Sequence, residues 1–382
     1  MQANVSFTRA RSAILAAGGL LCLITLSGCA GGGGGGGLST PSPFVYPPSL
    51  EQATSSDTVD GFISPYKLDA AGTTISSVLP TVSGTAPSAG KITITVDAIP
   101  LSSTVEEPKF VVTFDSTTTN GSTLPSLLSS NPFSSPLDSL PSLTATGPCQ
   151  DCLRVVTAPA KVNNVETATV TFIYLDPTST SFPLRYSVLG LWAKPTTTSA
   201  GSPDPFWPEV GGAFSAGVLT RGIDLPTTGS AGYAGYFVGR YATSDATLPY
   251  SPGTYIVGAN ASATADFSAR TVMFQTANTY IAPEAGGAAF AEPKLDLMST
   301  PMTILAGSTT NSFTGSVGSK NLATGFFPST TGKITGGFYG APDTSTGLPS
   351  SPPELGGSLS VGNGVDKELV GGFALVKKTS TP

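Results

Sequence analysis

The chain has 382 residues, of which 11% are charged, whereas about 25% is usual in soluble domains. Acidic residues outnumber basic ones, and the formal net charge of −6 argues against binding to nucleic acid. The chain contains no histidine, which excludes Ser-His-Asp and Cys-His catalytic systems, histidine-based zinc or copper sites and the histidine-containing iron triad. We therefore predict a protein that is not an enzyme and that holds neither a metal nor a cofactor.

Residues 1–28 are typical of a secretory signal peptide. Arg9 and Arg11 precede an uncharged apolar run that ends at Leu26 and is too short to span a bilayer. Removal of this segment takes away the two arginines and no acids, which leaves 16 basic against 24 acidic side chains and a net charge of −8. The mature chain is therefore predicted to be more acidic than the full sequence.

Cys29 ends the motif Leu26-Ser27-Gly28-Cys29, the pattern that bacterial lipoprotein processing cleaves and acylates. Several alkyl chains on one residue give stable membrane anchoring, which a single chain does not. We therefore predict that Cys29 is a lipid anchor and not a catalytic thiol. Residues 29–48 then form a tether, because they are rich in glycine and proline, and a flexible segment of this size spans roughly 20 Å. A terminus without a function is the alternative.

Residues 49–210 contain segments in which apolar and polar positions alternate, as in β-strands. Such segments are Lys91–Val96, Thr169–Phe172 and Arg185–Leu189. Between them, residues near 116–148 are mostly Ser, Thr, Pro and Leu without a sustained period, which indicates a long irregular connection. We predict a small β-rich domain over 49–210 that carries this low-complexity insert.

Two short motifs of this region have residue types that can carry chemistry. Cys149 and Cys152 form a C-x-x-C motif in a turn-rich segment. A redox role needs such a motif at a helix start, and a four-thiol zinc site needs two more cysteines, so a local disulfide is favoured in an exported protein. Glu106 and Glu107 have the carboxylates that glycoside hydrolysis uses, but adjacent acids before a proline are more often a solvated turn.

Three aromatic residues, Trp192, Phe206 and Trp207, lie close to the end of this region among proline and glycine. Large aromatic side chains are common anchors in protein interfaces. The favoured interpretation is that they pack the two domains of the chain together, and the alternative is that they contact a partner.

Residues 211–382 contain strand-like runs at close, regular spacing. The runs are 212–223, 230–242, 253–265, 268–276, 293–305, 311–318, 332–340, 354–361 and 367–377. Glycine lies inside many of them, and in strands it marks the bends and close backbone approaches that a small closed barrel needs. We therefore predict an antiparallel barrel over 211–382 rather than a flat sandwich. No helical pattern of convincing length occurs in the mature chain, so the predicted fold class is all-β.

Five motifs of this region, four of them rich in glycine, follow one another in order. They are Leu225 to Gly235, Ala265 to Phe267, Gly336 to Gly340, Glu354 to Gly357 and Gly371 to Lys378. This succession resembles the C-terminal barrel of the transferrin-binding-protein-B-like surface lipoproteins, a family that also includes factor H binding protein. The resemblance implies an eight-stranded barrel, preceded by a smaller and flatter β-rich handle, on a lipoprotein displayed at the Gram-negative cell surface.

The resemblance also implies binding to other molecules rather than catalysis. Together with the lipoprotein signal, it predicts an outer-membrane lipoprotein that binds an unknown macromolecule or complexed nutrient, as an accessory in iron or nutrient acquisition. A TonB-dependent receptor and a surface-lipoprotein exporter are the implied partners beside the membrane. Transferrin is not implied as the ligand, because transferrin-binding protein B has two handle-plus-barrel lobes and this chain has the length for one.

Two other functions stay open at this point. One is a small-molecule carrier with a lipocalin-like cavity, and the other is a structural or adhesive surface protein. Haem ligation would have to use tyrosine or methionine, but Tyr233, Tyr236 and Met273 look like ordinary strand residues.

Binding is expected at loop tips at one end of the barrel together with the adjoining handle, because a small filled barrel has no other concave site. The candidate loops are 241–253, 277–292 and 341–353. The candidate partner contacts are Trp192, Trp207, Tyr250 and Tyr280.

Overall fold

The computed structural model describes the strands of the fold and most connections of its C-terminal half. These are residues 59–68, 75–78, 92–100, 106–114, 153–162, 165–175, 183–197, 203–245, 247–248, 253–284, 288–307, 311–327, 332–342 and 350–378. Among them, helix is confined to two single turns, η2 (Gly222–Asp224) and η3 (Pro293–Leu295). In this part of the chain, no helix has the length and apolar character needed to cross a membrane. The predicted all-β class is confirmed.

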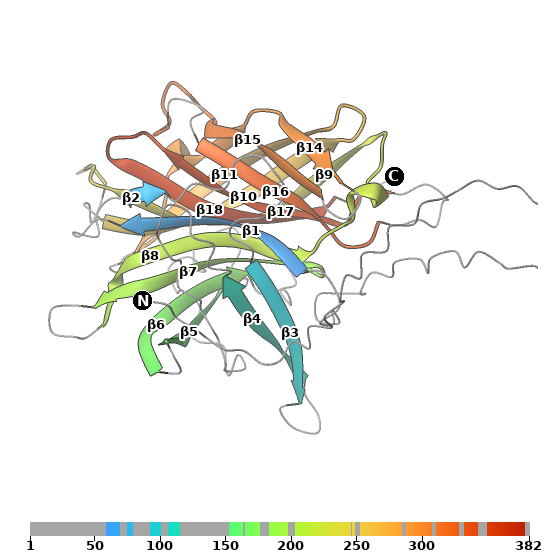
Figure 1. Cartoon of the computed structure of the whole chain (residues 1–382). Coiled ribbons are helices and arrows are strands. Elements are labelled where there is room, and N and C mark those ends of the chain that lie inside the picture. The colour runs from blue at the N-terminus through green and yellow to red at the C-terminus, as the bar shows by residue number, and fades with distance from the viewer. Residues whose placement is uncertain are drawn as a thin grey trace, which may run out of the picture.

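The first layer is a six-stranded antiparallel sheet in the order β2-β1-β8-β7-β6-β5 (Figure 1). Its strands are β1 (Val59–Leu68), β2 (Ile75–Val78), β5 (Leu153–Val162), β6 (Val165–Leu175), β7 (Ser187–Thr197) and β8 (Pro203–Val218). A separate ribbon of β3 (Ile92–Pro100) and β4 (Glu106–Phe114) contacts β1 and β8. Glu106 and Glu107 are the first residues of β4, paired with Pro100 and Ile99, so the predicted turn at this position is wrong.

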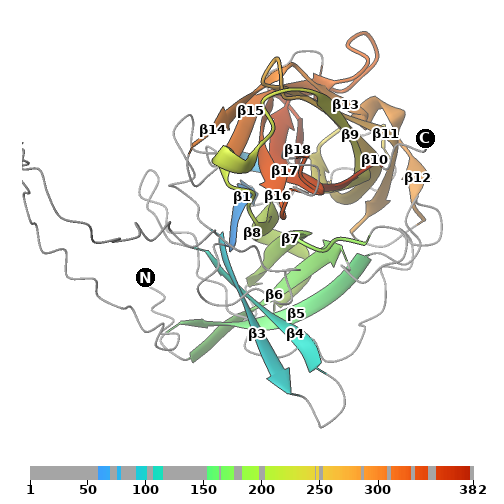
Figure 2. The same ribbon diagram turned by 90° about the vertical axis from the view of Figure 1, so that its right-hand side faces the viewer.

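The second layer is a closed antiparallel barrel, which Figure 2 shows nearly along its axis above the sheet. Its strands are β9 (Ser230–Thr243), β10 (Gly253–Asp266), β11 (Thr271–Pro283), β13 (Leu297–Ser299), β14 (Met302–Ala306), β15 (Asn311–Ser319), β16 (Gly332–Tyr339), β17 (Glu354–Gly362) and β18 (Lys367–Lys377), with β12 (Phe290–Ala291) paired to β11 outside the closed path. Strand β9 pairs with both β10 and β18, which closes the barrel. Strands β13 and β14 share one position between β11 and β15. The predicted eight-stranded barrel is confirmed.

The predicted runs match the barrel strands closely, with one difference at the domain border. Eight of the nine runs correspond to the eight barrel positions, and the run 293–305 comprises η3, β13 and β14. The remaining run, 212–223, is mostly the end of β8, which pairs with β1 and β7 in the six-stranded sheet. The predicted domain boundary at residue 211 therefore falls inside a strand of the sheet, and the first barrel strand begins at Ser230.

Aromatic side chains fill the interior of the barrel. Because side chains alternate along a strand, Tyr233, Phe237 and Tyr241 of β9 all belong to the buried inner core. The rings of Phe274 and Phe373 approach to 4.4 Å between centroids across the interior. Glycines between these positions leave room for the rings: a Cβ at Gly371 would overlap the ring of Phe237.

The outer wall of the barrel forms a second core with the six-stranded sheet. Strands β9, β10, β11 and β18 supply the barrel side, and the sheet side comes from β6, β7, β8 and the segment before β7. The shared core consists of Ile173, Leu175, Leu184, Leu189, Leu191, Ala213, Tyr236, Val238, Ala242, Ile256, Ala282, Val370 and Ala374. These contacts fix the sheet against one side of the barrel, as Figure 1 shows.

Candidate functional site

The barrel has two ends that carry different sets of connections, because antiparallel strands alternate in direction. Connections after β9, β11, β15 and β17 lie at one end, here called the Lys367 end. Connections after β10, β14 and β16 lie at the other, here called the Val59 end. Val59, the first residue of β1, pairs with Val218, and the neighbouring Leu219 bridges to Tyr339 at the end of β16.

The three candidate loops predicted from the sequence do not share one end of the barrel. Loops 241–253 and 277–292 lie at the Lys367 end, where Thr243 pairs with both Gly253 and Lys367. Loop 341–353 connects Tyr339 to Glu354 at the Val59 end, because an odd number of barrel positions, the three of β13/β14, β15 and β16, separates it from loop 277–292. The prediction of a single three-loop surface is wrong for this loop.

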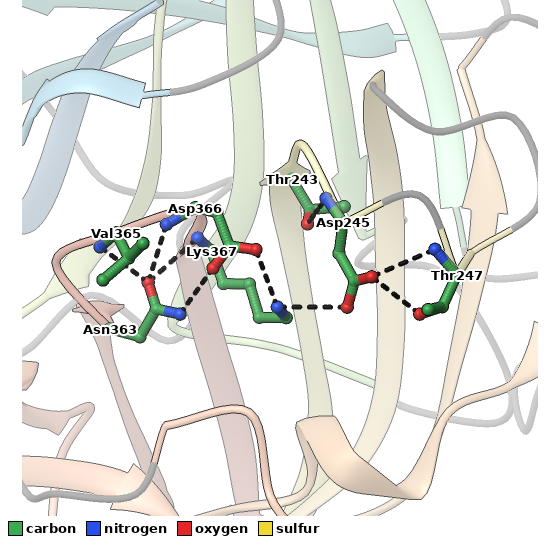
Figure 3. A network of polar contacts seen from close by, with 7 residues as sticks. All are labelled: Thr243, Asp245, Thr247, Asn363, Val365, Asp366 and Lys367. Atoms are coloured by element: carbon green, nitrogen blue, oxygen red, sulfur yellow. Dashed lines mark hydrogen bonds and ion pairs between the residues drawn. The ribbon is translucent and has the colours of Figure 1, made fainter.

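The turn between β17 and β18 is held by Asn363 (Figure 3). Its side-chain Oδ1 accepts hydrogen bonds from the backbone N–H groups of Val365, Asp366 and Lys367 at 2.9, 3.0 and 3.0 Å. Its Nδ2 donates to Asp366 Oδ1 at 2.7 Å. Gly364 has a φ of +72°, which glycine adopts without strain. This ordered turn presents Val365 to solvent with 85% of its surface exposed.

Lys367 links this turn to the connection after β9. Its Nζ lies 2.9 Å from Asp366 Oδ2 and 3.1 Å from Asp245 Oδ2, as Figure 3 shows. Asp245 Oδ1 accepts hydrogen bonds from the backbone N–H and the hydroxyl of Thr247 at 3.0 and 2.8 Å. The two connections are therefore joined through one ammonium group.

The protonation states of this network follow from its hydrogen bonds. Those from Thr247, and then that from Lys367, lower the pKa of Asp245 to about 2. Hydrogen bonds from Asn363 and Lys367 likewise lower the pKa of Asp366. Burial alone would lower the pKa of Lys367, but its hydrogen bonds to the two carboxylates raise it. At neutral pH the network therefore holds one cation between two anions.

An aromatic cluster closes the barrel beneath this network. Phe326, in the connection after β15, stacks on Tyr241 with a centroid separation of 5.9 Å and an interplanar angle of 3°. Phe327 meets Tyr241 edge to face at 6.5 Å. The ammonium groups of Lys294 and Lys367 lie 5.2 and 5.4 Å from the Phe326 ring centroid, within cation–π range. Phe326 thus connects η3 to the β17–β18 turn.

Two charged side chains and one apolar side chain stand exposed beside this cluster. Lys294 is on η3, Lys320 follows β15, and Leu322, in the same connection, is 54% exposed. The two segments are joined by backbone hydrogen bonds, from Lys320 N–H to Asp296 O at 2.7 Å and from Phe326 N–H to Lys294 O at 3.2 Å. The Lys367 end is thus one surface on which two exposed apolar side chains lie among lysines.

The partner contacts predicted from the sequence do not gather at this surface. Trp192 of β7 is 1% exposed, so it is not available to a partner. Leu189 and Leu191 of the same strand pack against the barrel. Because side chains alternate between the two faces of a strand, Trp192 faces away from the barrel. Trp207 lies within β8, where its side chain is outside the described part of the structure. Tyr280 is half-buried on β11, paired with Gly258 and Ala291.

The remaining predicted positions lie outside the described residues. They are the lipidation residue Cys29, the disulfide candidates Cys149 and Cys152, and the candidate contact Tyr250. Lipidation and the disulfide stay predictions. Within the described part of the chain, no three His, Cys, Asp or Glu side chains are placed to hold a metal ion. Asp245 and Asp366 converge instead on the ammonium of Lys367.

Sequence reasoning missed the residues that build this surface. The signal for the turn was present, because Gly362-Asn363-Gly364 between two strands is typical of a hairpin connection. The pairing of Lys367 with Asp245 carries no local signal, because more than 100 positions separate them in the sequence.

Comparisons with known proteins found similar solved structures only. No family model and no curated protein matches the chain. The chain is similar in fold to transferrin-binding protein B. The structure of that protein from Haemophilus parasuis is 12% identical, with 84% of this chain and 46% of the other covered and a TM-score of 0.41. The protein from Neisseria meningitidis is 16% identical, with 60% and 35% covered and a TM-score of 0.32.

A further similar structure is described as a surface lipoprotein. It is 12% identical to this chain, with 51% of this chain and 77% of the other covered and a TM-score of 0.30. The chain spans less than half the length of the two transferrin-binding protein B structures. Identities this low concern the fold alone, so what this chain binds has to be argued from its own residues.

Proposed function

We propose that this chain is a non-enzymatic surface lipoprotein that binds a macromolecule through the Lys367 end of its barrel. The observation that carries the proposal is the ordered presentation of Val365, which is 85% exposed on a turn held by Asn363. An exposed valine gains no hydrophobic stabilisation from folding. A turn fixed before binding also loses little conformational entropy in a complex. These two properties are expected of an apolar contact residue that already has its bound conformation before the partner binds.

The filled interior favours this proposal over a lipocalin-like carrier. Eight-stranded barrels have room for their own side chains or for one small ligand. Here the rings of Phe274, Phe373, Phe313 and Phe338 lie in contact inside the barrel, with centroid separations of 4.4 Å for the first pair and 5.8 Å for the second. Phe326 and Tyr241 stack across the Lys367 end. Binding is therefore assigned to the outer surface.

The proposed anchor is joined to the fold at the end of the barrel opposite this surface. If Cys29 is lipidated, the tether leads to Val59, which lies at the end of the barrel opposite Lys367. The Lys367 end is then the end of the barrel farther from the point where the anchored segment enters the fold, and a flexible tether leaves it accessible to a macromolecule. We include in the proposal an outer-membrane location, an accessory role in iron or nutrient acquisition, and cooperation with a TonB-dependent receptor and a surface-lipoprotein exporter. Transferrin, which names the similar proteins, is not the proposed partner.

Site-specific photo-cross-linking in living cells tests the proposal and does not require the partner to be identified first. The photoreactive residue p-benzoylphenylalanine replaces Val365 in the full chain, and in a second variant it replaces Leu322. Ile223, which is 68% exposed on η2 at the Val59 end, provides the matched control position. We expect discrete higher-mass adducts from positions 365 and 322 and none from position 223.

Three outcomes would contradict the proposal. Adducts of equal yield from all three positions would show that contact is not confined to the Lys367 end. Adducts from position 223 alone would place the binding surface at the Val59 end. Adducts that contain only further copies of this chain would favour the structural or adhesive alternative over binding to another macromolecule.

A further inference from the structure

We infer that the protein surface bound at the Lys367 end is acidic and contacts the lysine patch formed by Lys294 and Lys320. This inference rests on the proposed function and adds the chemistry of the partner. Both lysines are exposed, and the backbone hydrogen bonds between η3 and the connection after β15 hold them on one surface. A third exposed lysine, Lys333, follows at the start of β16.

The first step of the argument is that nearby carboxylates are engaged elsewhere. Asp245 and Asp366 bind Lys367, and Glu284 accepts hydrogen bonds from Arg240. The side chain of Asp296 accepts from the N–H and hydroxyl of Thr279 at 3.2 and 2.6 Å. Glu292 is buried and caps η3 by accepting from the backbone N–H of Lys294 at 3.3 Å. Of these carboxylates, Glu292 is buried, whereas Asp245 and Asp366 stay partly exposed and are paired with Lys367.

The second step is that the patch keeps its positive charge. Among the described residues, neither Lys294 nor Lys320 forms an ion pair with a carboxylate. Lys294 lies over the face of Phe326, a contact that holds the ammonium in place without neutralising it. The patch is therefore basic on a chain whose net charge is −6. A local charge opposite to the net charge guides an oppositely charged partner toward that surface.

The third step concerns the class of partner. Membrane-binding segments carry about four to eight clustered basic residues, more than this patch has. The patch also lies at the end of the barrel opposite Val59, the first described residue after the predicted tether. Protein interfaces, by contrast, combine an apolar centre with a polar rim. The Lys367 end has such a combination, with Leu322 in the same connection as Lys320 and Val365 beside the Lys367 ion pairs. The geometry points to an acidic protein surface with at least one apolar side chain.

Charge reversal in the cross-linking experiment tests this inference. In the chain with p-benzoylphenylalanine in place of Val365, Lys294→Glu and Lys320→Glu are introduced together, and Lys378→Glu is the control. Lys378 is exposed at the Val59 end, where its N–H donates to Gly232 O. We expect the double variant to reduce the adduct yield about tenfold and the control to leave it unchanged. An adduct whose yield is unchanged in the double variant overturns the acidic-partner inference and leaves the proposed function intact.

A direct binding measurement gives the same test outside the cell. The probe is a fluorescent peptide with four repeats of Glu-Glu-Leu-Ser, the neutral control replaces each Glu by Gln, and the readout is fluorescence anisotropy with the purified mature protein. We expect the acidic peptide to bind more tightly, its affinity to fall with added salt, and Lys294→Glu or Lys320→Glu to weaken it. Equal affinity for the two peptides, or equal weakening by Lys378→Glu, overturns the inference. If position 365 gives no adduct in cells while the purified protein binds the acidic peptide, the result counts against the proposed function instead.

Discussion

The two ends of the barrel use buried or ordered polar networks for different purposes. At the Val59 end, the carboxylate of Glu354 accepts hydrogen bonds from Arg185 N–H at 2.6 Å, from Tyr186 N–H at 3.1 Å and from the Ser187 hydroxyl at 2.7 Å. These donors precede or begin β7, so the network joins the barrel to the sheet. At the Lys367 end, Asn363 and Lys367 join barrel connections only to each other. One network stabilises the junction of the two layers, and the other leaves its surface open.

Other contacts support this contrast. Asn311 of β15 donates through Nδ2 to Thr220 O and Phe338 O, and Tyr339 donates its hydroxyl to Ser215 O at 3.1 Å. Ser64 of β1 donates to Ser358 of β17 at 3.0 Å. The Val59 end and the neighbouring wall are thus committed to contacts within the chain. Both ends keep exposed apolar side chains, Ile223 at the Val59 end and Val365 and Leu322 at the Lys367 end, but only at the Lys367 end does the polar network join barrel connections alone.

The largest expected effect is from Glu354→Ala. Its side chain is buried, and its removal leaves the N–H groups of Arg185 and Tyr186 and the Ser187 hydroxyl without their acceptor. We expect the free energy of unfolding to fall by about 3 kcal/mol, and by about 1 kcal/mol for Glu354→Gln, which keeps one acceptor oxygen. Urea denaturation of the mature protein measures both. Equal losses for the two variants would contradict this expectation, because they would show that the acceptor oxygen kept by glutamine contributes nothing to stability.

The second prediction is that the two ends respond to pH in opposite directions. Burial raises the pKa of Glu354 from 4.5 to about 7, and its hydrogen bonds offset only part of that rise. The folded state therefore binds the proton of Glu354 more tightly than the unfolded state does. The stabilisation that this protonation gives the fold is complete below about pH 4.5 and is lost as pH rises through about 7. Asp245, with a pKa lowered from 3.8 to about 2, stabilises the fold above about pH 3.8 and loses this as pH falls.

Measurement of unfolding free energy against pH for wild type, Glu354→Gln and Asp245→Asn checks this. Burial also raises the pKa of Glu368 to about 7, so only the difference between each variant and wild type isolates one group. We expect the Glu354→Gln difference to change between about pH 4.5 and 7, and the Asp245→Asn difference to change between about pH 2 and 4. A Glu354→Gln difference that is constant across its range would contradict the assignment of this end.

Much of this architecture could be predicted from the sequence, because local patterns determine strands. The run 367–377 coincides with β18 (Lys367–Lys377), since alternating apolar residues and internal glycines mark a barrel strand directly. Strand β1 (Val59–Leu68) was missed, because its glycine and proline interrupt the alternation that would reveal it. The domain border was misplaced inside β8 because period-2 alternation does not tell which sheet a strand joins.

The candidate surface was harder to predict than the strands. Counting strand reversals among the predicted runs would have placed loop 341–353 at the opposite end, so this error was avoidable. Glu354 follows two prolines, a context typical of a solvated loop, and only the approach of Arg185 and Tyr186 makes it a buried acceptor. Trp192 illustrates the reverse: a tryptophan among glycine and proline suggests a contact surface, yet the packing of β7 buries it.

A smaller effect on stability is expected when the network of the Lys367 end is removed. Lys367→Met takes away both ion pairs, and Asn363→Ala removes the acceptor of three backbone N–H groups. We expect each to lower the free energy of unfolding by about 1 kcal/mol, since the groups released remain accessible to water. Hydrogen exchange should increase in residues 363–367 and 243–247 but not around Glu354. Faster exchange at both ends would mean that the two networks are not independent.

The smallest effect on stability is expected from Val365→Ala, and Val361→Ala provides its matched control. The two valines lie four positions apart on the same hairpin, but Val361 is 2% exposed within the barrel core and Val365 is 85% exposed. Loss of the buried methyl groups should cost about 2 kcal/mol, whereas loss of the exposed ones should change the free energy of unfolding by less than about 0.5 kcal/mol. Thermal and urea unfolding measure these values.

Binding is measured in the same variants by the yield of the partner adduct that forms through p-benzoylphenylalanine at position 322. Val365→Ala should reduce the adduct while leaving stability unchanged, because its exposed side chain contributes little to the fold. A variant that is stable and gives the full adduct would show that Val365 is not part of the contact.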